Sequence, residues 1–314
     1  MRVFVSGMGA VSPAGWGRAA LFRALDGGVP PTPQPLERPG WTRPLSVLRV
    51  PAPISRSPWA AHARMRRSSF ISQFALGAVV EALGDRAGGP LGIVYCTTCG
   101  GVNYSRRFYD EVLRDPSVAS PLLFPETVFN APASHLSAVL GSPAANYTLV
   151  GDAGVFLHGL ALAASWLAVG RVDCCLVVAA EEADWITADV LSHFCKSTTL
   201  AEGSGAVLLT RERRPSTCAE LEWVTNPEPF VGGYGRAARA AAALRVAAVL
   251  PTDLAPAIDV AVLGEGLSAS SAWLVLAAIA AAQRQGLSRA TVLVPGAYQE
   301  AIGASFIVLT PTTS

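Results

Sequence analysis

Short apolar runs rich in β-branched residues alternate along the chain with longer, alanine-rich segments. Runs of the first kind are typical of buried strands, and segments of the second kind are typical of buried or amphipathic helices. The pattern predicts strands over Val3–Ser6, Leu91–Tyr95, Asn146–Val150, Cys174–Val178, Ala206–Leu209, Val260–Leu263, Thr291–Val294 and Phe306–Leu309. It predicts helices over Ser69–Gly84, Pro132–Leu140, Val155–Val169, Gly235–Val249 and Ser270–Arg284.

Strands that alternate with helices of this length indicate βαβ units and a mostly parallel sheet that is covered on both faces. The predicted fold class is therefore α/β. Residues Gly28–Pro53 are rich in Pro, Arg and Gly, so they are expected to form a surface excursion. The charged run Arg211–Pro215 is the best internal boundary, and it divides the chain into halves 1–210 and 211–314.

Composition restricts the partners. The 314 residues carry a net charge of +1, so no general electrostatic attraction to nucleic acid or anionic lipid is expected. Hydrophobic residues make up 51% of the chain and charged residues only 15%, against about 25% charged residues in typical domains. This excess of apolar residues indicates a large core together with a sizeable protein interface. The apolar stretch Leu267–Ala282 is shorter than the ~20 residues that cross a bilayer, so it is expected to be a buried helix.

Cysteine usage and the first residues favour a cytoplasmic protein without a membrane partner. The N-terminal residues contain no long apolar segment of the signal-peptide kind, and the six scattered cysteines lack the density of a disulfide framework. Cys96 and Cys99 have the spacing of a redox or half-zinc motif, but the sequence offers no second ligand pair. No metal or other cofactor is expected.

Four motifs occur in a fixed order along the chain: the strand and glycine loop VFVSGMGAVSPAGWG at 3–17, the segment Ala119–Pro132, the stretch ALAASWLAVGRVDCCLVVAAEEAD at 161–184, and the run Ala201–Val207. In this order they resemble the β-ketoacyl synthases, the condensing enzymes of fatty-acid and polyketide assembly. The resemblance implies the thiolase fold, a five-layer αβαβα sandwich of two similar halves, here with a shortened C-terminal half. It also implies dimerisation through the strand at about Asn146–Val150.

The chain departs from that family at its catalytic positions. Family members accept the acyl group on a cysteine at the N-terminus of a buried helix, where the dipole lowers the thiol pKa, and two histidines assist decarboxylation. The nucleophile position falls on Ala153, Glu265 stands in place of the second histidine, and the loop of the first histidine is missing. No cysteine lies between Cys99 and Cys174, and no histidine follows His193. The chain therefore resembles a pseudo-ketosynthase.

Polar residues around these positions have two interpretations each. Asp152 is expected to cap the following helix, and the alternative makes its carboxylate a base or a mimic of the missing thiolate. A core or interface role is favoured for His158 over an acid–base role. Glu265 is favoured as a salt-bridged remnant over a general base. By spacing, His135 and His193 have no acidic or cysteine partner.

The preferred function is a non-catalytic subunit of the chain-length-factor type. It pairs with an active β-ketoacyl-ACP synthase in fatty-acid, polyketide or aryl-polyene biosynthesis and helps to shape the tunnel for the growing chain. Two alternatives stay open: an enzyme with altered chemistry (decarboxylase, thioesterase or acyltransferase), and a homodimeric scaffold that binds acyl carrier protein, which the basic stretch from His62 to Arg67 would contact. Candidate pocket or interface residues are Phe129, Asn130, Asp152, Phe156, His158 and Trp185.

Overall fold

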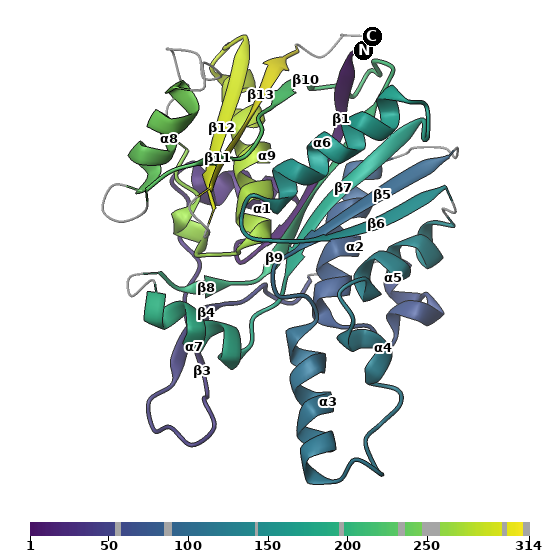
Figure 1. The fold of residues 1–314 in the computed structure, drawn as a ribbon, viewed down its shortest axis with the longest axis vertical. Helices are drawn as coiled ribbons and strands as arrows, with labels where there is room; N and C mark the ends of the chain where they lie inside the picture. Colours follow the sequence, from purple (N-terminus) through teal and green to yellow (C-terminus); the bar gives the residue numbers. More distant parts are fainter. Residues whose placement is uncertain are drawn as a thin grey trace.

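The computed structural model describes residues 1–53, 58–84, 90–141, 144–194, 198–231, 236–246, 258–296 and 300–309. Five long strands lie side by side in the order β6–β5–β7–β9–β1 (Figure 1). Their bounds are β1 Val3–Ser12, β5 Leu91–Thr97, β6 Ala145–Val150, β7 Cys174–Glu181 and β9 Gly203–Thr210. Strands β5, β7 and β9 are buried along their whole length, as expected for strands covered on both faces.

The expectation of a mostly parallel sheet is wrong. Strand β5 pairs in parallel with β6 and β7, but β7–β9 and β9–β1 are antiparallel. The helix that follows β7, α7 (Trp185–Phe194), packs against the short strands β4 (Leu45–Leu48) and β8 (Leu200–Ala201). Because this helix does not cross a face of the sheet, the chain re-enters the sheet at the end where β7 left it and runs back antiparallel.

A second group of strands continues from the N-terminal end of β1. Strand β10 (Ala219–Val224) pairs with β1 over Val3–Val5, β13 (Glu300–Val308) pairs with β10, and β12 (Arg289–Pro295) pairs with β13. All three pairs are antiparallel. The short strand β11 (Glu228–Pro229) pairs with β13 at the far edge of this group, and β2 (Gly15–Trp16) pairs with the C-terminal end of β1. The second group is thus smaller than the first among the described residues, in agreement with the shortened C-terminal half.

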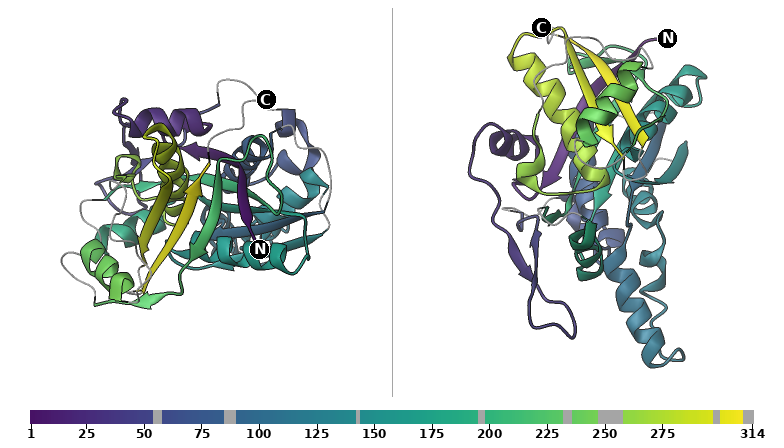
Figure 2. Two further views of the ribbon diagram at one scale, coloured as in Figure 1. Left: turned by 90° about the horizontal axis from the view of Figure 1, so that it is seen from above. Right: turned by 60° about the vertical axis from the view of Figure 1, so that its left-hand side comes forward.

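Helices complete five layers (Figures 1 and 2). Helix α2 (Phe70–Leu83) and α5 (Ala131–Leu140) cover the outer face of the first sheet, and α8 (Arg236–Val246) covers the outer face of the second group. Between the two lie α6 (Val155–Ala168) and α9 (Ser268–Arg284), which contact each other and strands of both groups. The order α–β–α–β–α confirms the thiolase-like α/β sandwich.

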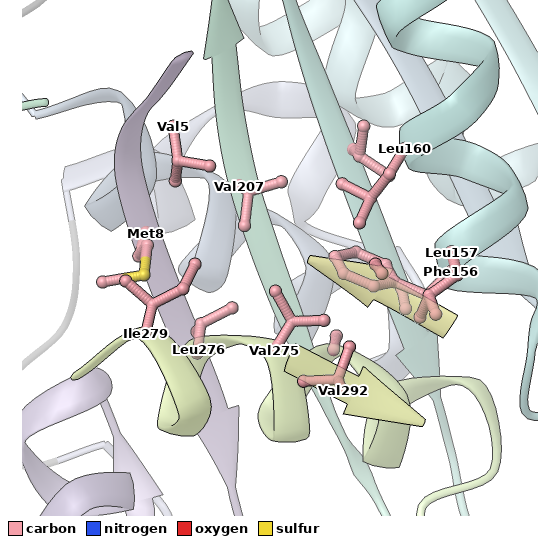
Figure 3. Packing of buried hydrophobic residues seen from close by; sticks show 14 of the residues in the cluster. Val5, Met8, Phe156, Leu157, Leu160, Val207, Val275, Leu276, Ile279 and Val292 are labelled. Carbon is pink, nitrogen blue, oxygen red and sulfur yellow. The ribbon is translucent and has the colours of Figure 1, made fainter. Parts of the chain in front are cut away.

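The middle layer holds the main hydrophobic core (Figure 3). Phe156, Leu157 and Leu160 of α6 meet Val275, Leu276 and Ile279 of α9 and the inward side chains of the strands, and all six are fully buried. A second apolar cluster joins α2 to the outer face of the first sheet. There Gly7 and Gly9 let β1 approach α2 closely: a Cβ at Gly9 would lie 2.0 Å from the Ala78 carbonyl oxygen.

Outside the sandwich, two segments project from the same end of the molecule (Figure 1). One is the predicted surface excursion, whose β3 (Gln34–Leu36) and β4 form a hairpin that is mostly exposed. It is anchored by Val47 and Leu48, which are buried where β4 pairs with β8. The other is α3 (Val102–Arg114), followed by α4 (Phe124–Thr127). Smaller elements are α1 (Arg18–Leu25), η1 (Pro58–Ala61) and η2 (Ala63–Met65).

Three further expectations can be compared with these elements. The strand expected at Val260–Leu263 is wrong, because Ala261–Leu263 forms a 3-10 turn, η3, that no described strand pairs with. The helix expected at Gly235–Val249 is present as α8, and Gly235 and 247–249 lie outside the described residues. The division into halves stays a prediction: the charged run Arg211–Pro215 lies between β9 and β10. No helix in the described ranges is long and apolar enough to cross a membrane.

Candidate functional site

The start of α6 holds the position where the family resemblance places a nucleophile. Ala153 is partly buried and packs against the main core, and Gly154 is the N-cap residue of the helix. Gly154 lies close to the second strand group, since a Cβ there would come within 2.9 Å of the Ile302 side chain. The helix N-terminus is therefore in place between the two sheets, but the residue at its entrance carries a methyl group only. A methyl group cannot accept an acyl chain.

The cysteine nearest to this helix on the sheet side is not poised for nucleophilic chemistry. Cys96 of β5 is fully buried beneath α6, and a Cβ at Gly159 would lie 2.7 Å from its sulfur. Burial, and then the neighbouring Cys175, raise the pKa of the Cys96 thiol far above its ordinary value. Burial and then the charge of Glu181 raise the pKa of Cys99 to about 12. Both thiols therefore stay protonated and unreactive near neutral pH.

Within the described ranges, no three His, Cys, Asp or Glu side chains are grouped so as to hold a metal ion. Cys96 points into the core from a strand, which is the environment of a small hydrophobic residue.

Asp152 closes the turn that leads into α6. Its Oδ1 accepts a hydrogen bond from the Gly154 backbone N–H at 3.0 Å, and its backbone carbonyl accepts one from Val155 N–H. A Cβ at Gly296 would lie 2.2 Å from Oδ2, so this glycine leaves the space that the carboxylate occupies. The N-cap residue of α6 is Gly154, so the expectation that Asp152 caps the helix is wrong: its carboxylate closes the turn that precedes the first helical residue. A role as base or thiolate mimic stays a prediction.

Glu265 organises the turn before α9. Its backbone forms a bridge beside Leu200, and its carboxylate accepts a hydrogen bond from the Leu267 N–H at 2.7 Å. Leu267 has a φ of 52°, in the left-handed region that costs a non-glycine residue roughly 1 kcal/mol or more. The Glu265 carboxylate thus holds the backbone N–H of Leu267, the strained residue that precedes the first turn of α9. Whether Glu265 also takes part in chemistry stays a prediction.

Two buried carboxylates at the end of β7 were not among the candidate residues. Glu181 accepts hydrogen bonds from the Ser268 hydroxyl at 2.5 Å, the Cys99 N–H at 3.1 Å and the Thr98 N–H. Glu182 accepts one from the Asn103 N–H at 2.8 Å. Burial raises the pKa of each to about 7, against the lowering effect of these hydrogen bonds. The sequence signal was two acidic residues directly after a fully apolar strand, which predicts burial of charge but not its partners.

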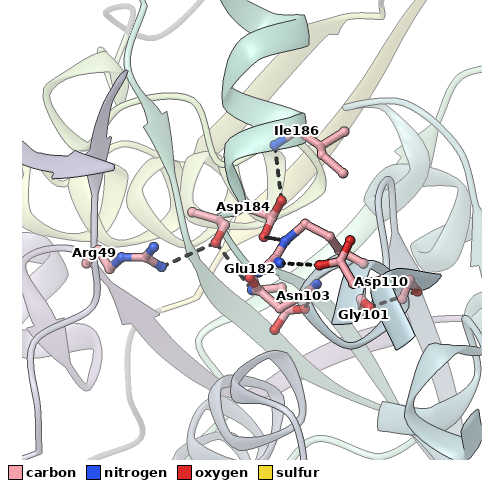
Figure 4. A network of polar contacts seen from close by, with 10 residues as sticks. Arg49, Gly101, Asn103, Asp110, Glu182, Asp184 and Ile186 are labelled. Atoms are coloured by element: carbon pink, nitrogen blue, oxygen red, sulfur yellow. Dashed lines mark hydrogen bonds and ion pairs between the residues drawn. The ribbon is translucent and has the colours of Figure 1, made fainter. Parts of the chain in front are cut away.

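Glu182 belongs to a network that joins four segments (Figure 4). Arg49 donates to Glu202 at 2.8 Å, and Arg106 of α3 donates to Asp184 at 2.8 Å. Burial raises the pKa of Glu202 despite the nearby Arg49. The network attaches the hairpin, α3 and the start of α7 to the end of β7. We assign the network a structural role, because Arg49 and Arg106 each pair with a buried carboxylate.

The buried carboxylates at the end of β7 give a pH dependence that can be measured. Their pKa of about 7 lies above the ordinary 4.5, so between these values the folded chain keeps protons that the unfolded chain releases. The free energy of unfolding should therefore fall as pH rises from about 5 to 7, by up to roughly 3 kcal/mol per group. Glu181→Gln should remove about half of this fall in urea titrations at pH 5, 6, 7 and 8. Glu212→Gln, at an exposed site, is the control; an unchanged slope in Glu181→Gln would contradict the assignment.

The remaining candidate residues lie in different environments. Phe156 is fully buried in the middle layer. His158, two residues further along α6, points to another side of the helix and is exposed. Phe129 is 45% exposed and packs over Gly100, and Asn130 is exposed at the start of α5. Trp185 begins α7, half-buried, with an indole N–H that has no partner among the described residues. The structure places Asn130 beside β6, whereas Phe129, Phe156 and Trp185 lie in other surroundings.

The expectation that His135 and His193 lack acidic partners is wrong. His135 lies 2.6 Å from Glu126, which also accepts the Ser69 N–H at 3.2 Å, and His193 lies 3.6 Å from Asp189. Burial alone would raise the pKa of Glu126, but the bonds from His135 and Ser69 together hold it below its ordinary value. Sequence spacing missed the first pair because the chain reverses between α4 and α5. The pair fixes α4 against α5 and the start of α2.

Strand β6 forms an open edge of the first sheet. Among the described strands it pairs only with β5, and its Tyr147 and Val150 are 54% and 53% exposed. The adjacent face of α6 is also exposed at His158, Ala161 and Ser165. An unpaired strand edge with exposed apolar side chains is a template for pairing with another chain.

Comparison with known proteins places this geometry in a structural context. No protein-family model matches the sequence, and no curated protein matches it. The ishigamide ketosynthase/chain length factor has a TM-score of 0.82 and 21% identity over 99% of this chain and 100% of that chain. A ketosynthase in complex with its chain length factor, from Xenorhabdus doucetiae, has a TM-score of 0.75 and 14% identity over 98% of each chain. A type II polyketide acyl carrier protein in complex with its ketosynthase gives 0.74 and 14% over 98% of this chain and 99% of that chain. The resemblance to ketosynthases and chain length factors is thus confirmed at the level of the fold.

Proposed function

We propose that this chain is a non-catalytic subunit of the chain-length-factor type, which pairs with an active β-ketoacyl-ACP synthase in fatty-acid or polyketide biosynthesis, aryl polyenes included. The observation that carries the proposal is Ala153 at the start of α6, where the fold presents a helix N-terminus without a thiol. The partner then supplies the cysteine and the histidines. Two of the similar structures contain a chain length factor, which supports this assignment.

The open edge of β6 supports pairing with another subunit. Tyr147 and Val150 of β6 present exposed apolar side chains, and burying them against a partner would be favourable. We assign Phe129 and Asn130 to the part of this surface that borders the tunnel of the partner. Phe156 would act only indirectly, since it holds α6 from inside the core.

A direct test co-expresses the chain with the ketosynthase encoded nearest to it on its own genome. Native mass spectrometry is expected to show a one-to-one complex. After incubation with an acyl thioester, intact-mass analysis is expected to find the acyl group on the ketosynthase only, because the described thiols of this chain are buried or half-buried, and burial raises the pKa of Cys96, Cys99, Cys175 and Cys218. A covalent acyl adduct on this chain, or no complex at all, would refute the proposal.

Exposed arginines favour a contact with acyl carrier protein as well. Arg64, Arg66 and Arg67 are exposed around η2, and the Arg107 guanidinium lies over the Tyr104 ring, 5.1 Å from its centre. Tyr104 donates to the Arg67 carbonyl at 3.1 Å, which brings the helix α3 arginine next to the others. None of the four arginines forms an ion pair within the described part of the chain. An acidic carrier protein fits this unpaired positive surface.

Charge reversal tests the carrier contact. Arg66→Glu with Arg67→Glu is expected to weaken binding of the acidic carrier protein at least tenfold at low salt, with a smaller difference at high salt because the contact is electrostatic. Arg23→Glu with Arg43→Glu is the matched control, since it changes the net charge equally at exposed arginines elsewhere. Equal weakening by both pairs, measured by isothermal calorimetry, would show that only net charge matters.

The free cysteines support the proposed cytoplasmic location. Every cysteine that the structure describes is a free thiol. Free thiols persist in reducing compartments.

A further inference from the structure

One edge of β12 has no strand beside it in the described part of the chain. β12 pairs with β13 only, at the end of the second strand group (Figure 1). The pair closes with a bond from the Gly296 N–H to the Glu300 carbonyl at 2.7 Å. Hydrogen-bonded positions alternate along an antiparallel pair, so the backbone groups of Thr291 and Leu293 face away from β13. Neither residue makes a backbone hydrogen bond to another described segment.

A hollow of about 810 Å³ opens along this edge. It is lined by three consecutive residues of β12, Thr291, Val292 and Leu293. Successive side chains of a strand point to opposite faces, and here Val292 packs in the main core while Leu293 packs in the cluster beneath α8. A hollow that touches both faces of a strand lies at its edge. The unused backbone groups of β12 therefore border the hollow.

The walls of the hollow are mostly apolar. Helix α9 contributes the small side chains Ala277, Ala278 and Ala281, and α1 contributes Phe22 and Leu25. The two helices flank the open edge, so a single extended segment can lie along it. A second copy of β12 would have to bring its own flanking helices with it.

The first half of the molecule shows what covers the corresponding edge there. β7, β9 and β1 form two successive antiparallel pairs, and so do β12, β13 and β10. A buried helix precedes the first strand of each set, α6 before β7 and α9 before β12. In the first set β5 lies along the other edge of β7, but no described strand takes that place along β12. The shortened second half thus leaves open an edge that the first half buries.

The charges at the rim favour a positively charged occupant. Asp26 and Arg284 line the hollow and pair with each other at 2.8 Å. Asp259 also lines it, is exposed, and forms no ion pair with a described residue. One negative charge is therefore left over beside an apolar surface, and a cationic group next to an apolar segment complements it.

We infer that the open edge of β12 takes up an extended, apolar peptide segment of another protein, with a lysine or arginine at one end, as an added strand. The backbone of the segment bonds Thr291 and Leu293, its apolar side chains fill the hollow, and its cation meets Asp259. In strand addition, main-chain hydrogen bonds give the affinity and pockets for alternate side chains give the specificity. The site belongs to the second strand group, so it is separate from the β6 edge that we assign to the ketosynthase.

A defined peptide tests the inference on the full-length chain. The probe alternates valine and threonine, has the length of β12 and ends in arginine. Its control carries N-methyl groups on two adjacent central amides, which keep the side chains but block pairing through either edge. Fluorescence anisotropy is expected to show about tenfold weaker binding of the control. Equal binding of the two peptides would overturn the inference.

Hydrogen exchange resolved by residue locates the contact. The amides of Thr291 and Leu293 should exchange fast in the free chain and slowly when the probe is bound, whereas the Val292 amide, bonded to β13, should be protected in both states. If Thr291 and Leu293 are already as protected as Val292 in the free chain, the edge is covered and the inference is wrong.

Substitutions separate the edge, the hollow and the charge. Thr291→Pro removes an outward N–H, which an edge strand tolerates, and should weaken probe binding about tenfold, whereas Thr291→Val keeps the N–H and should bind as wild type does. Ala281→Phe fills the hollow and should also weaken binding about tenfold, which keeps the test decisive if Thr291→Pro does not fold. Asp259→Asn should weaken it about threefold at low salt.

Two results with these variants would overturn the inference. One is wild-type affinity for the probe in both Ala281→Phe and folded Thr291→Pro. The other is a wild-type homodimer, seen by sedimentation velocity, that Thr291→Pro dissociates, because it would assign the edge to a second copy of this chain.

Discussion

Val150→Asp is expected to abolish the complex with the ketosynthase without unfolding the chain. Val150 is 53% exposed at the end of β6, so an aspartate there remains hydrated in the isolated chain. In the complex the carboxylate would be buried against the partner edge without a counter-charge. An unpaired buried charge costs several kcal/mol, so we expect association to weaken by more than a hundredfold.

Association and stability must be measured together to interpret this variant. The free energy of unfolding from urea titration should stay within about 0.5 kcal/mol of wild type, as for other surface changes. Val29→Asp is the matched control: Val29 is 90% exposed in the segment before β3, and it should bind as wild type does. Normal binding by Val150→Asp would place the interface away from β6.

The largest loss of stability is expected from Gly9→Ala. Gly9 lies in β1, where its missing side chain lets α2 come close: an added Cβ would lie 2.0 Å from the Ala78 carbonyl oxygen and 2.9 Å from the Ala82 nitrogen. Both are backbone atoms of a packed helix, so relief requires β1 and α2 to move apart. We expect the free energy of unfolding to fall by about 4 kcal/mol.

A second glycine separates this packing effect from a general loss of backbone freedom. A Cβ at Gly151 would meet only the Val155 side chain, at 3.2 Å, and a side chain can adjust. Gly151→Ala should change the free energy of unfolding by no more than about 1 kcal/mol. Equal losses in the two variants, measured by urea titration, would show that close approach of β1 to α2 is not the cause.

Elements with continuous burial could be predicted from the sequence, and others could not. The run at Leu91–Tyr95 became β5, and the small-residue segment at Ser270–Arg284 became most of α9, because the first is fully buried and the second is buried along most of its length. Helix α3 was missed although apolar and charged residues alternate along it with the helical period; none of its residues is buried, so that period indicates a helix without a place in the core. The run at Val260–Leu263 has β-branched residues, but a strand also needs a neighbour to pair with, and local pattern does not supply one.

The positions in the candidate site that follow from the order of the sequence motifs could be predicted, and the contacts between distant segments could not. Motif order placed Ala153 at the start of a buried helix and Glu265 in the turn before another, and both elements are present there. Contacts made by chain reversal could not be predicted: Glu126 and His135 are nine residues apart, and Thr148 meets α5 only after the fold has formed. The raised pKa of Glu181 likewise depends on burial by distant segments.

The position of β1 between the two strand groups affects how the chain must be synthesised. Strand β1 is synthesised before the other described strands, and it pairs with β9 and β10, about 200 residues later. Contacts of such large sequence separation form slowly, and during that time both edges of a long apolar strand lack their final neighbours. Nascent chains released before residue 210 would therefore be prone to aggregate, so chaperone binding during translation and the presence of the last hundred residues should decide the yield of folded protein.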